Sequence, residues 1–283
     1  LQIVWLHGNK WQKRKREIEM EFFDNHSHYN DEKFDEDREE IILKTKEEGI
    51  TKINCVGYDI ESSKFSLELA NKYDFIYSIC GISPNDVPEN KEEIEMQVIQ
   101  IEELLKKDIN NKIVAVGEIG LDYYWNKENK EIQKETFIRQ IELANKYKLP
   151  IVIHTREAVQ DTLDILKQNN VIKKGVFHCC PLNRELVKEA LKLGFYISFA
   201  GPITFKNSKN ASEIVNMVPL ERILIETDSP YLAPEPKRGT RNDCRNVKLV
   251  AEKIAEFKQI SLEEVANATY NNALTIFEKS HKI

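Results

Sequence analysis

The sequence lacks several features that would place it in a common protein class. No apolar run among its 283 residues approaches the roughly 20 residues that a membrane-spanning helix needs. Its five cysteines form no CxxC pair, and their odd number disfavours a disulfide framework, so we expect a reducing, cytoplasmic compartment. The net charge of −6 argues against a general nucleic-acid coat protein, which would normally be basic. We see no linker, repeat or low-complexity segment that divides the chain.

The N-terminal residues 1–19 differ from the rest of the chain. They hold a short apolar piece followed by the basic cluster 13–16, which is the reverse of the order in a signal peptide. We expect an extension with little fixed structure, and a nucleic-acid-binding arm is the alternative. Residues 20–283 are predicted to form a single domain, which is long enough to bury a core.

The remainder of the chain alternates between short apolar runs and amphipathic stretches. Eight runs, mostly of β-branched or aromatic residues, predict strands at 21–25, 52–57, 75–81, 112–118, 150–154, 175–178, 195–200 and 222–227. Between them, apolar residues recur every three or four positions, as in 90–107, and this spacing predicts helices. Gly49 predicts the end of the first helix, and Ser261 with Glu264 forms a capping box that predicts the start of the last. The fold class is therefore predicted to be α/β, a TIM (β/α)8 barrel.

Side chains that can bind a metal stand where several of these runs end. They are His26, His28, Glu118, His154, His178 and Asp228. In a TIM barrel the active site lies at the carboxyl ends of the strands, so we expect these side chains to meet at one mouth. The spacing of His26 and His28 turns both rings to the same face of an extended chain. Imidazole and carboxylate together are the ligands of a hydrolytic metal centre.

A structural interpretation competes with this one. A single buried histidine or glutamate at a strand end is more often a hydrogen-bonded structural group than a ligand. However, burying four imidazoles and two carboxylates together without a metal would cost a large free energy. The joint pattern therefore favours a metal-dependent hydrolase. The two other histidines, His7 and His281, lie in the terminal segments and are expected to play no part.

The motifs around these residues resemble those of the TatD family of metal-dependent deoxyribonucleases, within the amidohydrolase-like barrel superfamily. The resemblance runs from Met20 almost to the C-terminus, and it rests on the segments DNHSH, GEIGLDYY, IHTREA, FHC, GFYISFAGPITFKN, ETDSPYLAP and RGTRND. One segment departs from the family pattern. Family members usually continue FHC with a Phe-Ser-Gly-like turn, whereas Cys180, Pro181 and Leu182 follow here, which alters the loop after His178.

The resemblance implies two divalent metal ions, for which Mg, Mn and Zn are the candidates. The implied ligands are His26, His28 and Asp228 for one ion and His154 and His178 for the other, with Glu118 between them. Such a pair can activate a water and stabilise the leaving oxygen of a phosphodiester. Asp228 is the expected general base, with a pure ligand role as its alternative, and Glu118 is the second expected catalytic residue.

Contacts to substrate are expected from cations and aromatic rings around the mouth. Guanidinium groups suit phosphate oxygens, and aromatic rings can stack on unpaired bases. The candidates are Arg156, Arg238, Arg241, Tyr123, Tyr124 and Trp125. For each of them, a surface ion pair or a packing role is the alternative.

The resulting prediction is a cytoplasmic, metal-dependent deoxyribonuclease that acts on DNA as a 3′-end or single-strand exonuclease, with RNA as an alternative substrate. No membrane and no obligate protein partner is implied. The alternative activity is hydrolysis of small amides or esters on the same site, as in a deacylase. A binding protein that has lost catalysis is disfavoured because every expected ligand is present. The native metal stays open, since imidazoles suit zinc or manganese while nucleases often use magnesium.

Overall fold

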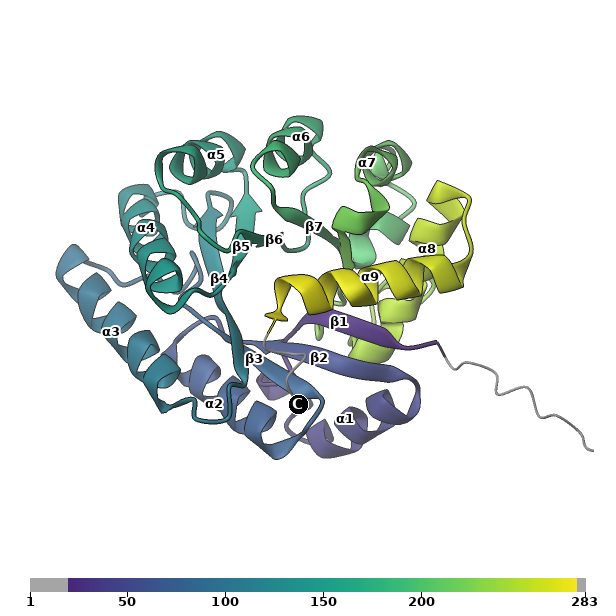
Figure 1. The fold of residues 1–283 in the computed structure, drawn as a ribbon, viewed down its shortest axis with the longest axis horizontal. Helices are drawn as coiled ribbons and strands as arrows, with labels where there is room; N and C mark the ends of the chain where they lie inside the picture. The colour runs from purple at the N-terminus through teal and green to yellow at the C-terminus, as the bar shows by residue number, and fades with distance from the viewer. Residues whose placement is uncertain (1–19, 279–283) are drawn as a thin grey trace, which may run out of the picture.

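The protein is described by a computed structural model that covers residues 20–278, so the expectations for 1–19, His7 and His281 lie outside the described residues. Its centre is a sheet of eight parallel strands that follow one another in chain order. The strands are β1 (Phe22–Ser27), β2 (Ile50–Val56), β3 (Ile76–Cys80), β4 (Ile113–Asp122), β5 (Ile151–Arg156), β6 (Gly175–Phe177), β7 (Tyr196–Phe199) and β8 (Ile223–Ile225). Helices surround the strands on the outside (Figure 1), which confirms the predicted TIM barrel.

Local sequence signals mark several of the helices. The helices are α1 (Arg38–Glu47), α2 (Ile60–Lys72), α3 (Lys91–Lys107), α4 (Lys130–Tyr147), α5 (Val159–Gln168), α6 (Arg184–Lys192), α7 (Ala211–Met217), α8 (Val247–Lys258) and α9 (Leu262–Ile276). The predicted capping box of Ser261 and Glu264 begins α9. Gly49 follows α1 with a φ of +87°, a conformation that glycine adopts without strain. Among the helices of residues 20–278, none has the length and apolarity that crossing a membrane requires.

Three strands extend further at their carboxyl ends than the sequence pattern predicts, and β1 continues past residue 25 to Ser27. The run ending at Glu118 continues as strand to Asp122, and β5 continues past His154 to Arg156. The reason is that β4 and β5 stay paired over this stretch, with Gly120 opposite His154 and Asp122 opposite Arg156. His154 therefore lies within a regular stretch of the ladder. Glu118 lies in β4 at the register shift between Val116 and Ile119, where its amide donates to the Gly57 carbonyl (3.2 Å).

The barrel closes between β1 and β8 by a short seam. In the part of the chain that the structure describes, one isolated bridge lies here, between Ser27 of β1 and Ser229, four residues after the end of β8. The Asp24 carboxylate, which is fully buried, accepts hydrogen bonds from the amide and the hydroxyl of Thr227 (3.0 and 2.6 Å). The Asp228 amide donates to the His26 carbonyl (2.9 Å). The seam thus brings the first strand and the segment after the last strand together at the carboxyl end.

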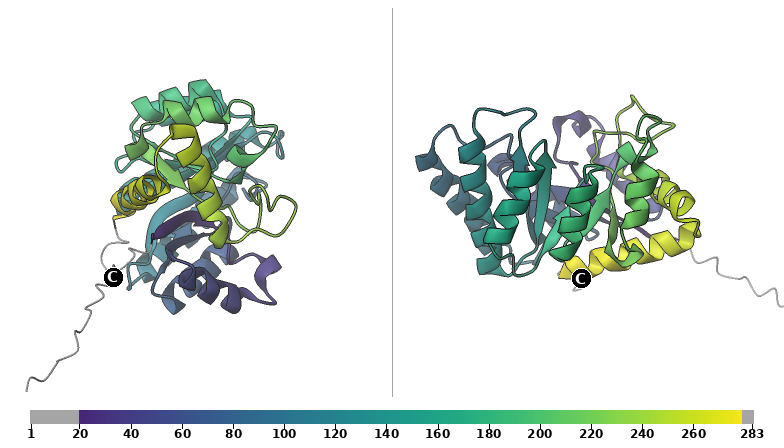
Figure 2. Two further views of the ribbon diagram at one scale, coloured as in Figure 1. Left: turned by 90° about the vertical axis from the view of Figure 1, so that its right-hand side faces the viewer. Right: turned by 90° about the horizontal axis from the view of Figure 1, so that it is seen from above.

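Helix α9 covers the opposite, amino end of the barrel. Phe277, just after α9, lies 6.2 Å from Phe23 of β1, ring centre to ring centre, and Tyr270 of α9 lies 6.1 Å from the same ring. Phe23, Tyr77 and Phe277 are buried together in the interior at this end. Figure 2 (right) shows α9 along one end of the barrel and the loops that follow the strands at the other. Because aromatic packing fills the amino end, the carboxyl end is where a site can form.

Candidate metal centre at the carboxyl end of the barrel

The six predicted ligands meet at the carboxyl end of the barrel. Five of them line one pocket of about 450 Å³, namely His28, Glu118, His154, His178 and Asp228. The sixth, His26, is fully buried beside them, with its ring stacked on that of His178 at 4.0 Å between centres. His26 lies in β1, Glu118 in β4 and His154 in β5, whereas His28, His178 and Asp228 lie just after β1, β6 and β8. The structure therefore brings together the six side chains that the sequence singled out, and their role as ligands stays a prediction.

Glu118 lies at the centre of this arrangement. One carboxylate oxygen, Oε2, is 3.3 Å from His26 Nε2 and 4.0 Å from His28 Nε2. The other, Oε1, is 2.9 Å from His154 Nδ1 and 3.3 Å from His178 Nε2. Each oxygen of one carboxylate thus faces a different pair of histidines.

Asp228 adds a second carboxylate to the first pair. Its Oδ1 is 3.4 Å from His28 Nε2 and 3.7 Å from His26 Nε2. Its backbone is in the left-handed region, with φ +57°, where aspartate is better tolerated than most residues. The buried Asn242 side chain holds the turn around it by donating to the carbonyls of Thr227 (2.9 Å) and Tyr231 (2.8 Å). This clamp accounts for the conformation of the ETDSPY segment.

The donor atoms have the spacing of metal ligands. Ligands held about 2.0–2.1 Å from a tetrahedral ion lie about 3.4 Å from one another. Three groups have donor atoms within 4.8 Å of one another: His26 with His28 and Glu118, Glu118 with His154 and His178, and His26 with His178 and Glu226. Glu118 belongs to the first two groups. The residues present therefore fit two divalent ions that share one carboxylate.

The outward nitrogens of the rings indicate where the lone pairs lie. His28 Nδ1 is 2.9 Å from the Val56 carbonyl, and His154 Nε2 is 3.0 Å from Asp122 Oδ2. Because these partners only accept, the outward nitrogens carry the protons of the neutral rings. The inward nitrogens of these two rings then present lone pairs, His28 toward His26 Nε2 at 3.2 Å and His154 toward His178 Nε2 at 3.1 Å. A cation between the rings, or a proton on Nε2 of His26 and of His178, would satisfy these lone pairs.

The close contact of imidazoles and carboxylates also shifts the pKa values of these side chains. Burial disfavours the charged form of His178, but the carboxylates of Glu118 and Glu226 outweigh burial and raise its pKa well above the usual value. Burial likewise opposes the charge of Glu118, yet His178, His154 and His26 hold its pKa well below the usual value. Without a metal, protons on the imidazoles therefore balance the buried carboxylates.

Two carboxylates of the site were missed in the sequence analysis. Asp122 accepts from His154, and Glu226 Oε1 lies 3.5 Å from His178 Nδ1. Glu226 is fully buried and accepts hydrogen bonds from the Cys179 amide and the Ser198 hydroxyl, both at 2.5 Å. A signal was present for each, since Asp122 lies four residues after Glu118 in one strand and Glu226 two residues before Asp228. Even spacing in extended chain turns side chains to the same face.

The aromatic candidates divide into two groups. Trp125 lines the pocket. The exposed Tyr124 ring packs edge-on against the Trp125 ring, with 4.8 Å between ring centres. The Arg156 guanidinium stacks on the Tyr124 ring at 3.8 Å and lies 5.5 Å from the Trp125 ring. Tyr123 instead is buried, and its hydroxyl donates to Asp161 (2.7 Å). Tyr124, Trp125 and Arg156 thus form an aromatic–cation wall at the mouth, whereas Tyr123 packs behind it.

The two other predicted arginines are not brought to the pocket. Arg241 donates to both carboxylate oxygens of Asp37 and to the Lys33 carbonyl, beside the start of α1. Arg238 lies over the ring of Phe205, 4.2 Å from its centre. Their roles in substrate binding stay predictions. The rest of the pocket lining comes from residues that the sequence analysis did not single out, Tyr58, Ser83, Asn85, Asp86 and Tyr231.

The altered loop after His178 leaves that residue in place. The His178 amide donates to the Ile153 carbonyl of β5 (3.1 Å), and the Cys180 amide donates to the Ser198 carbonyl of β7 (3.0 Å). Leu182 packs against the core, and Asn183 caps α6 through its side chain. The unusual sequence therefore forms a loop anchored to both neighbouring strands.

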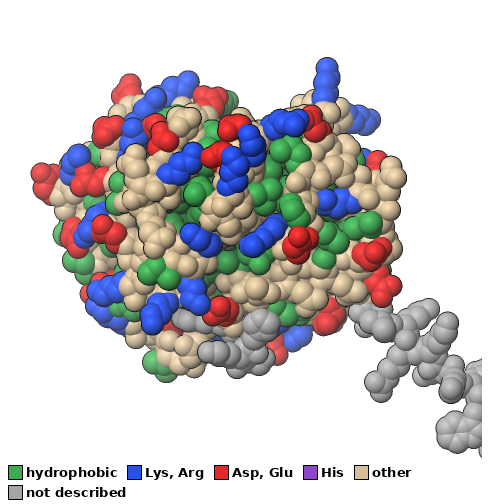
Figure 3. All heavy atoms as spheres, turned by 45° about the horizontal axis from the view of Figure 1, so that its top comes forward, with side chains coloured by type: hydrophobic (Ala, Val, Ile, Leu, Met, Phe, Trp, Pro, Cys, Tyr) green, Lys and Arg blue, Asp and Glu red, His purple; other side chains and the backbone are tan. Residues whose placement is uncertain are grey.

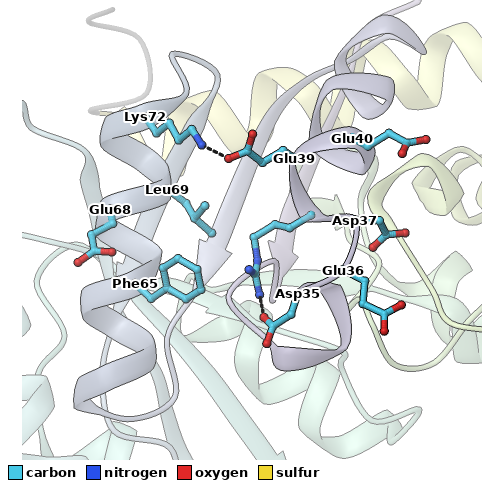
Figure 4. Close-up of a pocket in the computed structure, with 10 residues that line it drawn as sticks. Asp35, Glu36, Asp37, Glu39, Glu40, Phe65, Glu68, Leu69 and Lys72 are labelled. Carbon is cyan, nitrogen blue, oxygen red and sulfur yellow. Dashed lines mark hydrogen bonds and ion pairs between the residues drawn. The ribbon is translucent and has the colours of Figure 1, made fainter.

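A larger hollow of about 570 Å³ lies between α1 and α2 but has a different chemistry (Figure 4). Its lining is rich in carboxylates, and its cations are engaged in ion pairs, Arg38 with Asp35 and Lys72 with Glu39. No histidine lines it. Exposed ion pairs of this kind contribute little free energy and need no bound metal. The mouth of the barrel is therefore the candidate metal centre.

Comparison with known proteins agrees with this geometry. The family model described as TatD related DNase matches residues 23–278. An uncharacterized metal-dependent hydrolase of Bacillus subtilis, YabD, is 44% identical over 256 residues, which cover 90% of this chain and 98% of the relative. The Escherichia coli uncharacterized metal-dependent hydrolase YcfH is 34% identical over 262 residues, covering 91% of this chain and 96% of the relative.

Solved structures give the same result. A TatD homologue from Escherichia coli, YJJV, superposes with a TM-score of 0.86 at 26% identity and covers 92% of this chain and 99% of its own. A TatD family hydrolase from Entamoeba histolytica, at 24% identity, shares the fold with a TM-score of 0.82, covering 91% of this chain and 98% of its own. The sequence match, the barrel and the histidine–carboxylate cluster at its mouth lead to one conclusion: this chain belongs to the TatD related DNase family and is a metal-dependent hydrolase.

Proposed function

We propose that the protein is a two-metal deoxyribonuclease that hydrolyses phosphodiester bonds at the ends of single-stranded DNA. The observation that carries this proposal is the position of Glu118, whose two oxygens each face a different histidine pair. His26, His28 and Asp228 would hold one divalent ion, Mg, Mn or Zn, and His154 and His178 the other, with Glu118 shared. When bound, the two ions supply Lewis-acid activation of a water and charge stabilisation of the phosphodiester oxygens.

Asp228 is suited to the role of general base. It lines the pocket, and although burial opposes its charge, His28, His26 and His178 lower its pKa below the usual value. Its carboxylate is therefore ionised at neutral pH and can accept a proton from the attacking water as the oxygen attacks phosphorus. The bond from phosphorus to the leaving oxygen then breaks.

The shape and charge of the mouth support an end-acting enzyme on single strands. A pocket of about 450 Å³ suits a group of small-molecule size, such as a terminal nucleotide. Trp125 and Tyr124 offer exposed rings on which an unpaired base can stack. Basic and acidic side chains are interspersed on the face drawn in Figure 3, which lies away from the mouth. Because the whole chain has a net charge of −6, phosphate recognition at the mouth would be local. Arg156 is the predicted cation nearest to this wall of the pocket.

A second activity, hydrolysis of small amides or esters, uses the same residues. The observation that favours it is the lining of the pocket, which contains Ser83, Asn85 and Asp86 but no lysine or arginine. Polar neutral substrates would find hydrogen-bond partners there. The deciding experiment compares end-labelled single-stranded DNA and RNA with model amides and esters, each with Mg²⁺, Mn²⁺, Zn²⁺ and Co²⁺. Cleavage of oligonucleotides supports the nuclease, whereas turnover of amides or esters alone supports the deacylase.

We also propose that residues 20–283 form one domain that works in the cytoplasm. The first part is supported by the continuous sheet of the described residues and by the family match over 23–278. All five cysteines are free thiols, four of them buried. Such an arrangement is compatible with a reducing compartment.

Metal binding is predicted to strengthen as pH rises. The pKa values of His28, His154 and His178 are raised by their carboxylate neighbours against the opposing effect of burial. A metal binds neutral imidazole, so these protons must leave, and they persist above the ordinary histidine pKa of about 6.5. Titration with Mn²⁺ should give a higher affinity and fewer released protons at about pH 8 than at about pH 6. Equal affinity and no proton release at both values would contradict the ligand assignment.

Glu118→Gln is predicted to abolish most of the activity while the fold survives. Glutamine keeps the size of the side chain but loses the charge that two ions would share, so the rate of oligonucleotide cleavage should fall by about 100-fold or more. Glu128→Gln, the same change on an exposed loop residue, is the matched control and should behave like the parent. Near-normal turnover of Glu118→Gln, with an unchanged circular dichroism spectrum, would exclude the shared carboxylate.

Arg156→Ala is predicted to weaken oligonucleotide binding without changing metal content. Loss of one phosphate contact should raise KM and reduce the slope of log affinity against log salt by about 0.7 on single strands. Arg184→Ala is the control, because Arg184 pairs with Glu213 on the surface. Measurement of cleavage against salt concentration checks this. An unchanged slope would remove Arg156 from the binding surface, and a small acyl substrate should show neither effect.

A further inference from the structure

We propose that Asp122 is a positioning residue that couples the two parts of the site, since it sets the proton position of His154 and also holds the turn that carries Trp125. The inference rests on the proposed function, because it assigns His154 to a metal ion and Trp125 to the substrate. Asp122 is the last residue of β4 and is 1% exposed. Its two carboxylate oxygens have different partners.

One oxygen faces the metal centre. Oδ2 lies 3.0 Å from His154 Nε2, while the other nitrogen of that ring, Nδ1, lies 2.9 Å from Glu118 Oε1. Both partners are carboxylates that only accept, so a cation bound between Nδ1 and Glu118 would leave Asp122 as the acceptor of the ring proton and keep that proton on Nε2. The lone pair is then on Nδ1, the atom that faces the proposed metal position. Groups that orient ligating histidines in this way change metal affinity by about 10–100-fold.

The other oxygen faces the mouth. Oδ1 accepts hydrogen bonds from the backbone amides of Tyr124 (2.9 Å) and Trp125 (3.0 Å). These two bonds fix the turn that follows β4, from which the Trp125 ring extends into the pocket lining. The same carboxylate therefore sets both a metal ligand and the aromatic wall.

The main chain of Asp122 is itself fixed. Gln133 of α4 is fully buried; its Oε1 accepts from the Asp122 amide (2.9 Å), and its Nε2 donates to the Asp122 carbonyl (3.1 Å). The same Nε2 also donates to the Asn126 carbonyl (2.9 Å), on the far side of the turn. Asp122 thus has little freedom to rearrange when its side chain is changed.

This geometry makes Asp122→Asn a selective variant. Two backbone amides require an acceptor at Oδ1, so the amide oxygen of asparagine stays there and its NH2 group faces His154. A donor at that position requires Nε2 to accept, which moves the proton of the neutral ring to Nδ1 and blocks it as a ligand. The turn is kept, whereas Asp122→Ala removes both functions.

The experiment measures both parts without relying on catalysis. A Trp5→Phe/Trp11→Phe background leaves Trp125 as the one tryptophan of the chain, so that quenching by acrylamide reports on the wall. Co²⁺ titration, followed by its absorption spectrum, reports on the metals. We expect Asp122→Asn to bind one of two Co²⁺ ions about 10–100-fold more weakly with unchanged quenching, and Asp122→Ala to change both. Asp164→Asn on α5, whose carboxylate accepts from Gln160, is the matched control and should change neither.

Two results would overturn the proposal. One is parental Co²⁺ binding by Asp122→Asn, and the other is parental quenching by Asp122→Ala. If the variants fail to fold, ¹⁵N NMR of the parent protein with Zn²⁺ decides the matter, because the proposal requires the His154 proton on Nε2 and is refuted by a proton on Nδ1. Failure of the nuclease proposal is distinguishable, since it would appear as absent DNA cleavage by a parent protein that still binds two Co²⁺ ions.

Discussion

The site depends on the electrostatic balance around the Glu118 carboxylate. Glu118 is buried among four imidazoles, and each of its oxygens lies within 3.3 Å of at least one ring nitrogen. A buried carboxylate is stabilised only when positive charge or donors surround it. The inward nitrogens are paired at 3.1–3.2 Å, so the cluster must hold either protons or cations. Divalent ions would bind the nitrogen lone pairs and balance the carboxylate charge at the same time. This is why we assign the cluster as a candidate metal centre.

The barrel makes this concentration of polar groups possible. Aromatic packing under α9 fills the amino end of the interior, and the buried polar groups are gathered at the carboxyl end. The seam between β1 and β8 matters for the site. The Asp228 amide donates to the His26 carbonyl, which joins the segment after the last strand to the first strand. The buried Asp24 supports the seam through Thr227, and burial raises the pKa of this carboxyl to about 7. A structural carboxylate thus holds two proposed ligands in register.

The sequence predicts this arrangement well where side-chain type and strand ends coincide. Parallel strands bring their carboxyl ends together, and the structure accordingly gathers six side chains at one mouth, namely His26, His28, Glu118, His154, His178 and Asp228. Contacts between side chains of different strands and loops were harder to predict from the sequence. Whether Asp122 contacts His154 depends on the register of β4 against β5, which composition does not encode. Arg241 shows the same limit, because its ion pair with Asp37 spans 204 residues of sequence.

Sharing of Glu118 between two ions is the central claim, and electron paramagnetic resonance of Mn²⁺ tests it most directly. Two Mn²⁺ ions joined by one carboxylate are magnetically coupled, and their spectrum differs from that of two separate ions. We predict a coupled spectrum when two equivalents of Mn²⁺ are bound to the parent protein, and its loss in Glu118→Gln. Two uncoupled ions in the parent, or coupling that persists in Glu118→Gln, would contradict the account.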